Sequence, residues 1–129
     1  KLKGYIFSRP FMGERVPQSI QNLVIRNFCK NNKYLYLLSA AEYAMENSDA
    51  VLKSIINGSE GINGIVAYSL YQLPNDMKIR TIILKKIISK KMFFVSACEQ
   101  TFVKNNDDID NINKLWQIKE ILKYCPKEF

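Results

Sequence analysis

Gly64–Ser96 reads GIVAYSLYQLPNDMKIRTIILKKIISKKMFFVS, and this stretch decides the fold. It begins and ends with short apolar runs, Gly64–Tyr68 and Met92–Ser96, which predict two strands. Between them, Pro74-Asn-Asp76 predicts a turn in which Asp76 caps a helix. The helical spacing then predicts an apolar face made of Ile79, Ile82, Ile83 and Ile87. A crossover of this length makes the two strands parallel.

The same alternation continues on both sides of this stretch. Leu2–Ser8 and Tyr34–Leu38 predict two further strands, and Thr101–Asp110 is polar and predicts a loop. Three more helices are predicted. The first runs from Pro17 to about Lys33, and the second from a cap at Ser48 or Asp49 to Gly58, which ends it in the left-handed conformation. The third covers Asp110–Tyr124, and its Trp116 is expected to anchor a core or a dimer. We therefore expect a three-layer α/β fold, with a mainly parallel four- to five-stranded sheet and helices on both faces.

The composition narrows the class of protein. The 129 residues are 47% hydrophobic and 24% charged, so we expect a single α/β domain over residues 1–129. No apolar run is long enough for a membrane span and no signal-peptide pattern is present, so we expect a cytoplasmic location. The sequence has no histidine, and its three cysteines show no CxxC spacing. We therefore expect neither a metal nor a cofactor, and reduced thiols.

The formal net charge of +7 raises the question of an anionic partner. The lysines are scattered, with one local cluster at Lys85, Lys86, Lys90 and Lys91. We interpret most of this charge as a solvated surface, and we do not expect nucleic acid as a partner.

Polar side chains follow each of the four predicted strands. In open parallel sheets, ligands bind at the carboxyl ends of the strands, where the strand order changes direction. We therefore predict one shared crevice, although serine and glutamate at strand ends also cap helices. The residues are Ser8 and Arg9, then Ser39, Glu42 and Tyr43, then Tyr68, Ser69 and Gln72, and finally Ser96, Cys98 and Glu99.

The segment from Ser8 to Gln18, SRPFMGERVPQ, is the densest of these clusters. Two prolines bracket it, and a helix begins just after Pro17 and directs free amides towards it. Arg9 and Arg15 can each hold a phosphate or carboxylate bidentately, unless Glu14 pairs with one of them. Neither GxGxxG nor GxxxxGK[ST] occurs, so the segment is neither a dinucleotide fingerprint nor a P-loop.

These residue types suggest roles in a common site. Without histidine, a carboxylate with a raised pKa is the expected proton carrier, so Glu42 and Glu99, together with Ser8, are the candidate catalytic residues. Cys98 is a weaker candidate nucleophile, because the adjacent Glu99 disfavours its thiolate. The candidate substrate- and phosphate-binding residues are Arg9, Arg15, Gln18, Tyr68, Ser69 and Gln72.

Over Gly4–Thr101 the chain resembles the catalytic domain of the serine recombinases, the resolvases and invertases. Gly4-Tyr-Ile-Phe-Ser-Arg9 is similar to the opening strand of that family, and Phe94-Val-Ser-Ala-Cys-Glu99 to the end of its fourth strand. The resemblance implies a resolvase-like or flavodoxin-like fold. The family's third motif, LDRLxR, is replaced by Leu70-Tyr-Gln-Leu-Pro-Asn75, and Arg9 stands where the family has its nucleophilic serine. Recombinase activity is therefore not implied.

A second resemblance covers nearly the whole chain. Lys3–Gln18, Leu38–Met45 and Tyr68–Pro74 resemble small bacterial proteins of sporadically distributed clusters for surface-carbohydrate biosynthesis. This resemblance implies a protein of lipopolysaccharide or polysaccharide synthesis that binds or transforms a phosphorylated or nucleotide-linked sugar. The alternative is a non-catalytic resolvase-like scaffold that forms a homodimer through its last helix. A nucleic-acid binder is a third alternative.

Overall fold

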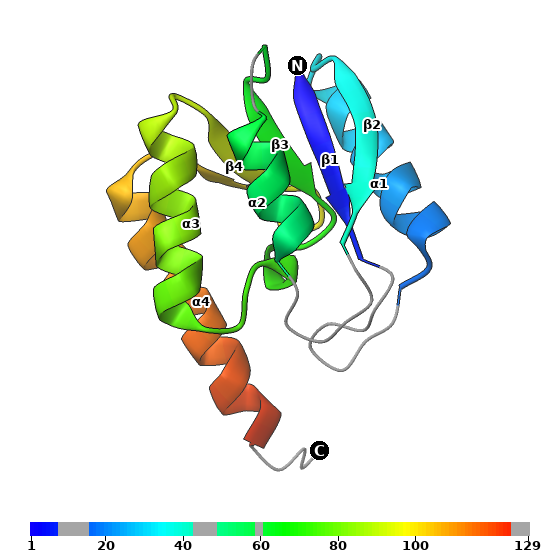
Figure 1. The fold of residues 1–129 in the computed structure, drawn as a ribbon. Coiled ribbons are helices and arrows are strands. Elements are labelled where there is room, and N and C mark those ends of the chain that lie inside the picture. The colour runs from blue at the N-terminus through cyan, green and yellow to red at the C-terminus, as the bar shows by residue number, and fades with distance from the viewer. Residues whose placement is uncertain (8–15, 43–48, 59–60, 125–129) are drawn as a thin grey trace.

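The computed structural model describes residues 1–7, 16–42, 49–58 and 61–124, which form one sheet with helices packed on it (Figure 1). The strands are β1 (Leu2–Ile6), β2 (Tyr36–Ala41), β3 (Gly64–Ala67), β4 (Phe93–Ser96) and β5 (Thr101–Val103). The helices are α1 (Gln18–Asn31), α2 (Ala50–Asn57), α3 (Met77–Ser89) and α4 (Asn106–Tyr124), with a short 3₁₀ helix, η1 (Leu70–Gln72).

The strand order in the sheet is β2-β1-β3-β4-β5. The pairs β1–β2, β1–β3 and β3–β4 are parallel, and β5 runs antiparallel to β4. The chain places β2 on one side of β1 and β3 on the other, so the strand order changes direction between β1 and β3. The predicted mainly parallel sheet is confirmed, and the carboxyl ends of β1 to β4 share one edge of it.

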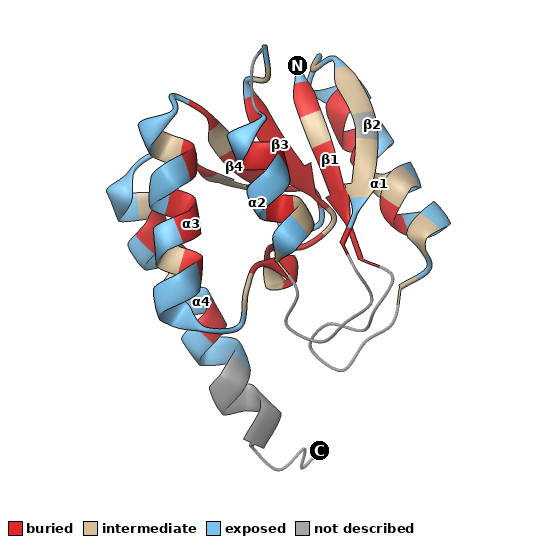
Figure 2. Ribbon diagram, in the orientation of Figure 1, coloured by how far each residue is buried: buried red, intermediate tan, exposed pale blue. Residues whose placement is uncertain are grey.

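Two hydrophobic cores lie on the two faces of this sheet. On one face α1 packs through Ile25, Phe28 and Cys29 against Val66 and Val95. On the other face α2, α3 and α4 bury a larger core, and the buried residues line the sides of these helices that face the sheet (Figure 2). The three-layer α/β architecture predicted from the alternation of strands and helices is therefore confirmed.

The apolar face predicted for α3 is rotated in the structure. Ile83 and Ile87 are buried as expected, but Ile79 is 41% exposed and Ile82 is 65% exposed. Their place is taken by Leu84 and by Arg80, which is only 3% exposed. The reason is the contact with α4, where the Arg80 guanidinium lies 4.4 Å from the centre of the Trp116 ring.

Trp116 belongs to the core, which was one of its two predicted roles. Its side chain is 1% exposed, and its indole N–H donates to the Leu70 carbonyl at 3.3 Å. Because α4 is tied to η1 in this way, the last helix is part of the domain core, although its carboxyl-terminal part extends beyond the start of α3 (Figure 1).

Three predicted boundaries are corrected by the structure. The predicted loop Thr101–Asp110 contains β5 and the first turn of α4, because Thr101 and Val103 pair with β4. The strand predicted at Tyr34–Leu38 begins and ends later, at Tyr36 and Ala41, because these are the residues that pair with Leu2 and Ile6 at the two ends of β1. Gly58 ends α2 with φ −99°, so the predicted left-handed stop is wrong; its N–H still donates to the Ser54 carbonyl.

The cap predicted for α3 is confirmed. The Asp76 carboxylate accepts hydrogen bonds from the N–H groups of Lys78, at 2.8 Å, and Ile79, at 3.3 Å. These are two of the amide groups that the start of a helix leaves without a backbone partner. In the described part of the chain, no helix has the length and apolarity that crossing a membrane requires.

Candidate functional site

The candidate site lies where β1, β3 and β4 end, on both sides of the change in strand order. β1 leads into Phe7, β3 into Tyr68 and Ser69, and β4 into Cys98 and Glu99. Backbone hydrogen bonds hold the last two ends together, since the Cys98 N–H donates to the Tyr68 carbonyl at 2.9 Å. Four strand ends were predicted to share one crevice. The ends of β3 and β4 are joined in this way, and at the end of β2 the Glu42 N–H donates to the Ile6 carbonyl of β1 at 2.9 Å.

Gln21 of α1 is the central polar side chain of this edge, and it is fully buried. Its Oε1 accepts from the Phe7 N–H at 2.9 Å, and its Nε2 donates to the Phe7 carbonyl at 2.8 Å. The same Nε2 also donates to the Val16 carbonyl at 2.8 Å. One amide therefore fixes the residues on both sides of the segment 8–15.

A second amide extends this network towards β4. Gln72 donates through Nε2 to Oε1 of Gln21 at 2.7 Å and accepts the Ser69 N–H at 3.2 Å. The Ser69 hydroxyl donates to Oε2 of Glu99 at 3.0 Å, and the Leu70 N–H donates to Oε1 of Glu99 at 2.9 Å. The network thus joins the ends of β1, β3 and β4, and Glu99 acts in it as the acceptor at the start of η1.

Glu42 is 2% exposed and anchors another helix. Its carboxylate accepts the Tyr5 hydroxyl at 2.8 Å and the N–H of Val51 at 3.1 Å, and Oε1 also accepts the Leu52 N–H at 3.3 Å. A carboxylate at the start of α2 is stabilised by the free amides and by the helix dipole. Glu42 and Glu99 therefore hold the starts of two different helices.

Two groups beside Glu99 have perturbed proton affinities. Partial burial raises the pKa of the Cys98 thiol; a hydrogen bond with Tyr68 lowers it, and the Glu99 charge raises it further. Burial likewise raises the pKa of the Tyr71 hydroxyl, with a smaller contribution from Glu99. Both shifts favour the protonated form, so Cys98 lacks the stabilised thiolate of a nucleophile.

The structure describes six of the nine predicted site residues. Ser69, Gln72 and Glu99 are brought together, Tyr68 adjoins them, Glu42 lies at the start of α2, and Gln18 is the half-buried first residue of α1. Ser8, Arg9 and Arg15 lie outside the described residues, as does Tyr43. Ser39 bonds to the Tyr36 hydroxyl, whereas the buried Ser96 hydroxyl has no hydrogen-bond partner among the described residues.

Sequence reasoning missed Gln21 and Tyr5, the partners of these residues. Gln21 lies four and seven positions before Ile25 and Phe28, which are both buried. A glutamine on the apolar face of an amphipathic helix is a detectable signal, because a buried amide must be hydrogen-bonded. Tyr5 offers no such signal, because a tyrosine in an apolar strand is usually a residue of the hydrophobic core, and the sequence does not show that its hydroxyl bonds to Glu42.

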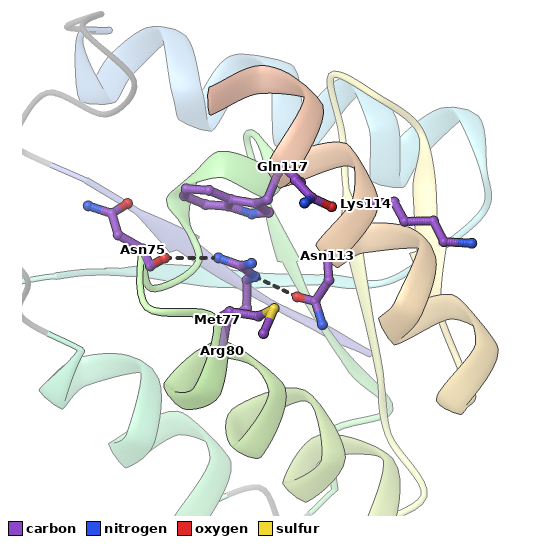
Figure 3. Close-up of a pocket in the computed structure, with 7 residues that line it drawn as sticks. Asn75, Met77, Arg80, Asn113, Lys114 and Gln117 are labelled. Atoms are coloured by element: carbon purple, nitrogen blue, oxygen red, sulfur yellow. Dashed lines mark hydrogen bonds between the residues drawn. The ribbon is translucent and has the colours of Figure 1, made fainter. Parts of the chain in front are cut away.

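A separate hollow of about 350 Å³ opens between the start of α3 and the middle of α4 (Figure 3). Arg80 lies in its floor, where Nε donates to Oδ1 of Asn113 at 2.9 Å and Nη1 donates to the Pro74 and Asn75 carbonyls at 3.0 and 3.2 Å. None of the predicted site residues lines this hollow. Its polar floor joins the turn before α3 to α4.

The chain has the fold of serine-recombinase catalytic domains. The N-terminal catalytic domain of TP901-1 integrase superposes with a TM-score of 0.64 at 14% identity, covering 95% of this chain and 99% of that one. A resolvase-family site-specific recombinase from Streptococcus pneumoniae gives a TM-score of 0.62 at 12% identity, covering 95% and 90%. The C-terminal catalytic domain of ISC1926 TnpA, an IS607-like serine recombinase, gives 0.54 at 10%, covering 93% and 98%.

No family model and no curated protein matches the sequence. At these identities the similarity concerns the fold, and function has to be argued from the site.

Proposed function

We propose that this chain is a non-catalytic module with a resolvase-like fold that forms a homodimer through α4. The observation that carries the proposal is on α4 itself. Leu115 and Ile118 are 38% and 54% exposed, while Ile112 and Trp116 are buried. Leu115 and Ile118 lie three residues apart and so share one side of the helix. That apolar side faces away from the core and suits a second copy of the same helix.

The hydrogen bonds of the candidate site support a non-catalytic role. Glu42 and Glu99 were the predicted acid-base residues, but each accepts two or more hydrogen bonds at the start of a helix. Using either group in proton transfer would remove acceptors that hold α2 or η1 in place. The two carboxylates are therefore better suited to organising the strand ends than to reacting with a substrate.

Light scattering after size-exclusion chromatography tests the dimer. We expect wild type at twice the mass of the chain and the variant Leu115→Glu/Ile118→Glu at the mass of one chain. Ile82→Glu is the matched control, because Ile82 is 65% exposed but lies on α3; it should remain dimeric. A wild-type monomer, or a dimer unaffected by both α4 substitutions, would contradict the proposal.

A second candidate function is the binding of a phosphorylated or nucleotide-linked sugar, in keeping with the resemblance to proteins of carbohydrate-biosynthesis clusters. The observation that favours it is the position of Gln21. Its bonds to Phe7 and Val16 hold both ends of the segment that carries Arg9 and Arg15 next to the change in strand order. Open parallel sheets bind their ligands there, and arginine is a residue type that binds phosphate bidentately.

Thermal unfolding with sugar phosphates and nucleotide sugars tests this second function. A ligand that binds the folded protein raises the melting temperature, by mass action. We expect such a shift with wild type, its loss in Arg9→Ala, and its retention in the control Arg26→Ala, a substitution in α1 outside the segment. The absence of any shift across both classes of ligand would exclude the proposed binding.

A further inference from the structure

The amino ends of the parallel strands form the edge of the sheet opposite to the candidate site (Figure 1). Lysines occur along this edge. Lys1 precedes β1, Lys33 lies before β2, Lys91 lies before β4, and Lys104 directly follows the antiparallel β5. Neighbouring strands are about 4.8 Å apart, so the row spans about 20 Å. We call these four residues the edge lysines.

Backbone hydrogen bonds join the segments that carry the edge lysines. The Leu2 N–H donates to the Leu35 carbonyl at 2.9 Å and the Asn63 N–H to the Lys1 carbonyl at 2.9 Å. The Phe93 N–H then donates to the Asn63 carbonyl at 3.2 Å. The segments that carry Lys33, Lys1 and Lys91 are therefore hydrogen-bonded to one another along this edge, and β5, which Lys104 follows, pairs with β4.

Two of the edge lysines sit in a backbone conformation that few residue types adopt. Lys33 has φ 60° and Lys91 has φ 58°, each in the turn between a helix and the next strand. This left-handed region costs free energy for most L-residues and suits asparagine and glycine better. Local backbone preference therefore does not explain lysine at either position, and both side chains are exposed.

Apolar side chains accompany the edge lysines. Leu35 is 59% exposed, directly after Tyr34. The rings of Tyr34, Phe93 and Phe102 are partly exposed and follow one another at centroid distances of 6.0 and 5.8 Å. The Lys104 ammonium lies 4.9 Å from the centre of the Phe102 ring. The edge thus combines an aliphatic side chain, aromatic rings and ammonium groups.

The positive charge of this edge is not cancelled by ion pairs within the described residues. The single ion pair found there joins Lys53 to Asp49 at 3.4 Å and involves none of the edge lysines. Asp108, at the start of α4, bonds through its carboxylate to the Lys104 N–H, and the exposed Asp107 and Asp110 lie in the same first turns, so the positive charge of the edge is concentrated at Lys1, Lys33 and Lys91. With a net charge of +7 on the whole chain, the edge attracts anionic surfaces.

We infer that the amino edge of the sheet binds the surface of an anionic lipid bilayer. The edge lysines contact lipid phosphates, Leu35 enters the boundary between headgroups and acyl chains, and the aromatic rings lie at headgroup level. Leu35 favours a bilayer over a nucleic acid, because an aliphatic side chain has no partner on a phosphate backbone. In this orientation the candidate site and the carboxyl end of α4 face away from the membrane.

Flotation with lipid vesicles tests the inference. We expect the protein to bind phosphatidylcholine vesicles that contain about 30% phosphatidylglycerol and to remain free with pure phosphatidylcholine. The triple variant Lys33→Asn/Lys91→Asn/Lys104→Gln removes three positive charges from the edge. Asparagine is used at positions 33 and 91 because it tolerates their left-handed backbone conformation. Since each lysine near an anionic surface contributes about five-fold, this triple variant should lower binding about 100-fold.

The matched control is Lys53→Gln/Lys78→Gln/Lys114→Gln, which removes the same charge elsewhere and should change binding far less. Leu35→Asn alone should reduce binding to the anionic vesicles several-fold, and it tests the edge if the triple variant does not fold. Equal loss in both triple variants, or equal binding to the two kinds of vesicle, would overturn the inference. So would a single-stranded oligonucleotide that binds in an edge-dependent manner when the anionic vesicles do not.

Discussion

Replacing Gln21 with leucine should destabilise the fold more than its position on a surface helix suggests. The side chain is fully buried and makes four hydrogen bonds, two with the Phe7 backbone, one with the Val16 carbonyl and one with Gln72. Leucine has a similar volume, so the core gains no large cavity. The substitution removes the partner of several buried polar groups at once.

The magnitude follows from those groups. A buried donor or acceptor that loses its partner costs about 1–3 kcal/mol, and part of this is recovered where water reaches the group. For the four bonds of Gln21 we expect a loss of about 3–5 kcal/mol in the free energy of unfolding. Domains of this kind have about 5–15 kcal/mol in total, so the variant should fold but unfold easily.

Urea unfolding followed by circular dichroism measures this loss. With a slope of about 1–3 kcal/mol per molar urea, the midpoint should fall by about 2 M at an unchanged slope. The control is Gln117→Leu, which alters an exposed glutamine of α4 and should change stability by less than about 0.5 kcal/mol. If Gln21→Leu cost less than about 1 kcal/mol, the network would not be what holds the strand ends together.

Three further predictions concern single residues. Gly64→Ala should destabilise the protein by about 2 kcal/mol or more, because an added Cβ would lie 2.7 Å from the Phe93 carbonyl oxygen in the neighbouring strand; an unchanged urea midpoint would refute this. Asp76→Ala should cost about 1 kcal/mol by removing the cap of α3, and Asp76→Asn should restore most of it, as measured by thermal unfolding; an equal loss in both would point to charge and not to capping. The rate of Cys98 alkylation by iodoacetamide should rise with pH and reach half its maximum above the ordinary thiol value of 9.0, because the folded environment raises the pKa of this thiol; a midpoint near neutral pH would show a stabilised thiolate instead.

The sequence by itself determined the class of the fold. Short, continuous apolar runs, separated by amphipathic segments of period 3.6, suffice to predict parallel strands with helices on both faces, because connections of that length have one handedness. Local signals also located the cap at Asp76 and the core positions Ile83 and Ile87. These features depend on neighbours within a few residues, and the sequence shows those neighbours directly.

Only the tertiary structure decided which polar residues act together. Glu42 and Glu99 look alike in the sequence, each a glutamate shortly after a strand, but one caps α2 with the help of Tyr5 and the other caps η1 with Ser69. Likewise, the face that α3 buries was set by the contact of Arg80 with Trp116, which lies 36 positions further along the chain. The partners in each case come from segments far apart in sequence, so no local pattern encodes them, and packing alone selects the pairings that satisfy the buried groups.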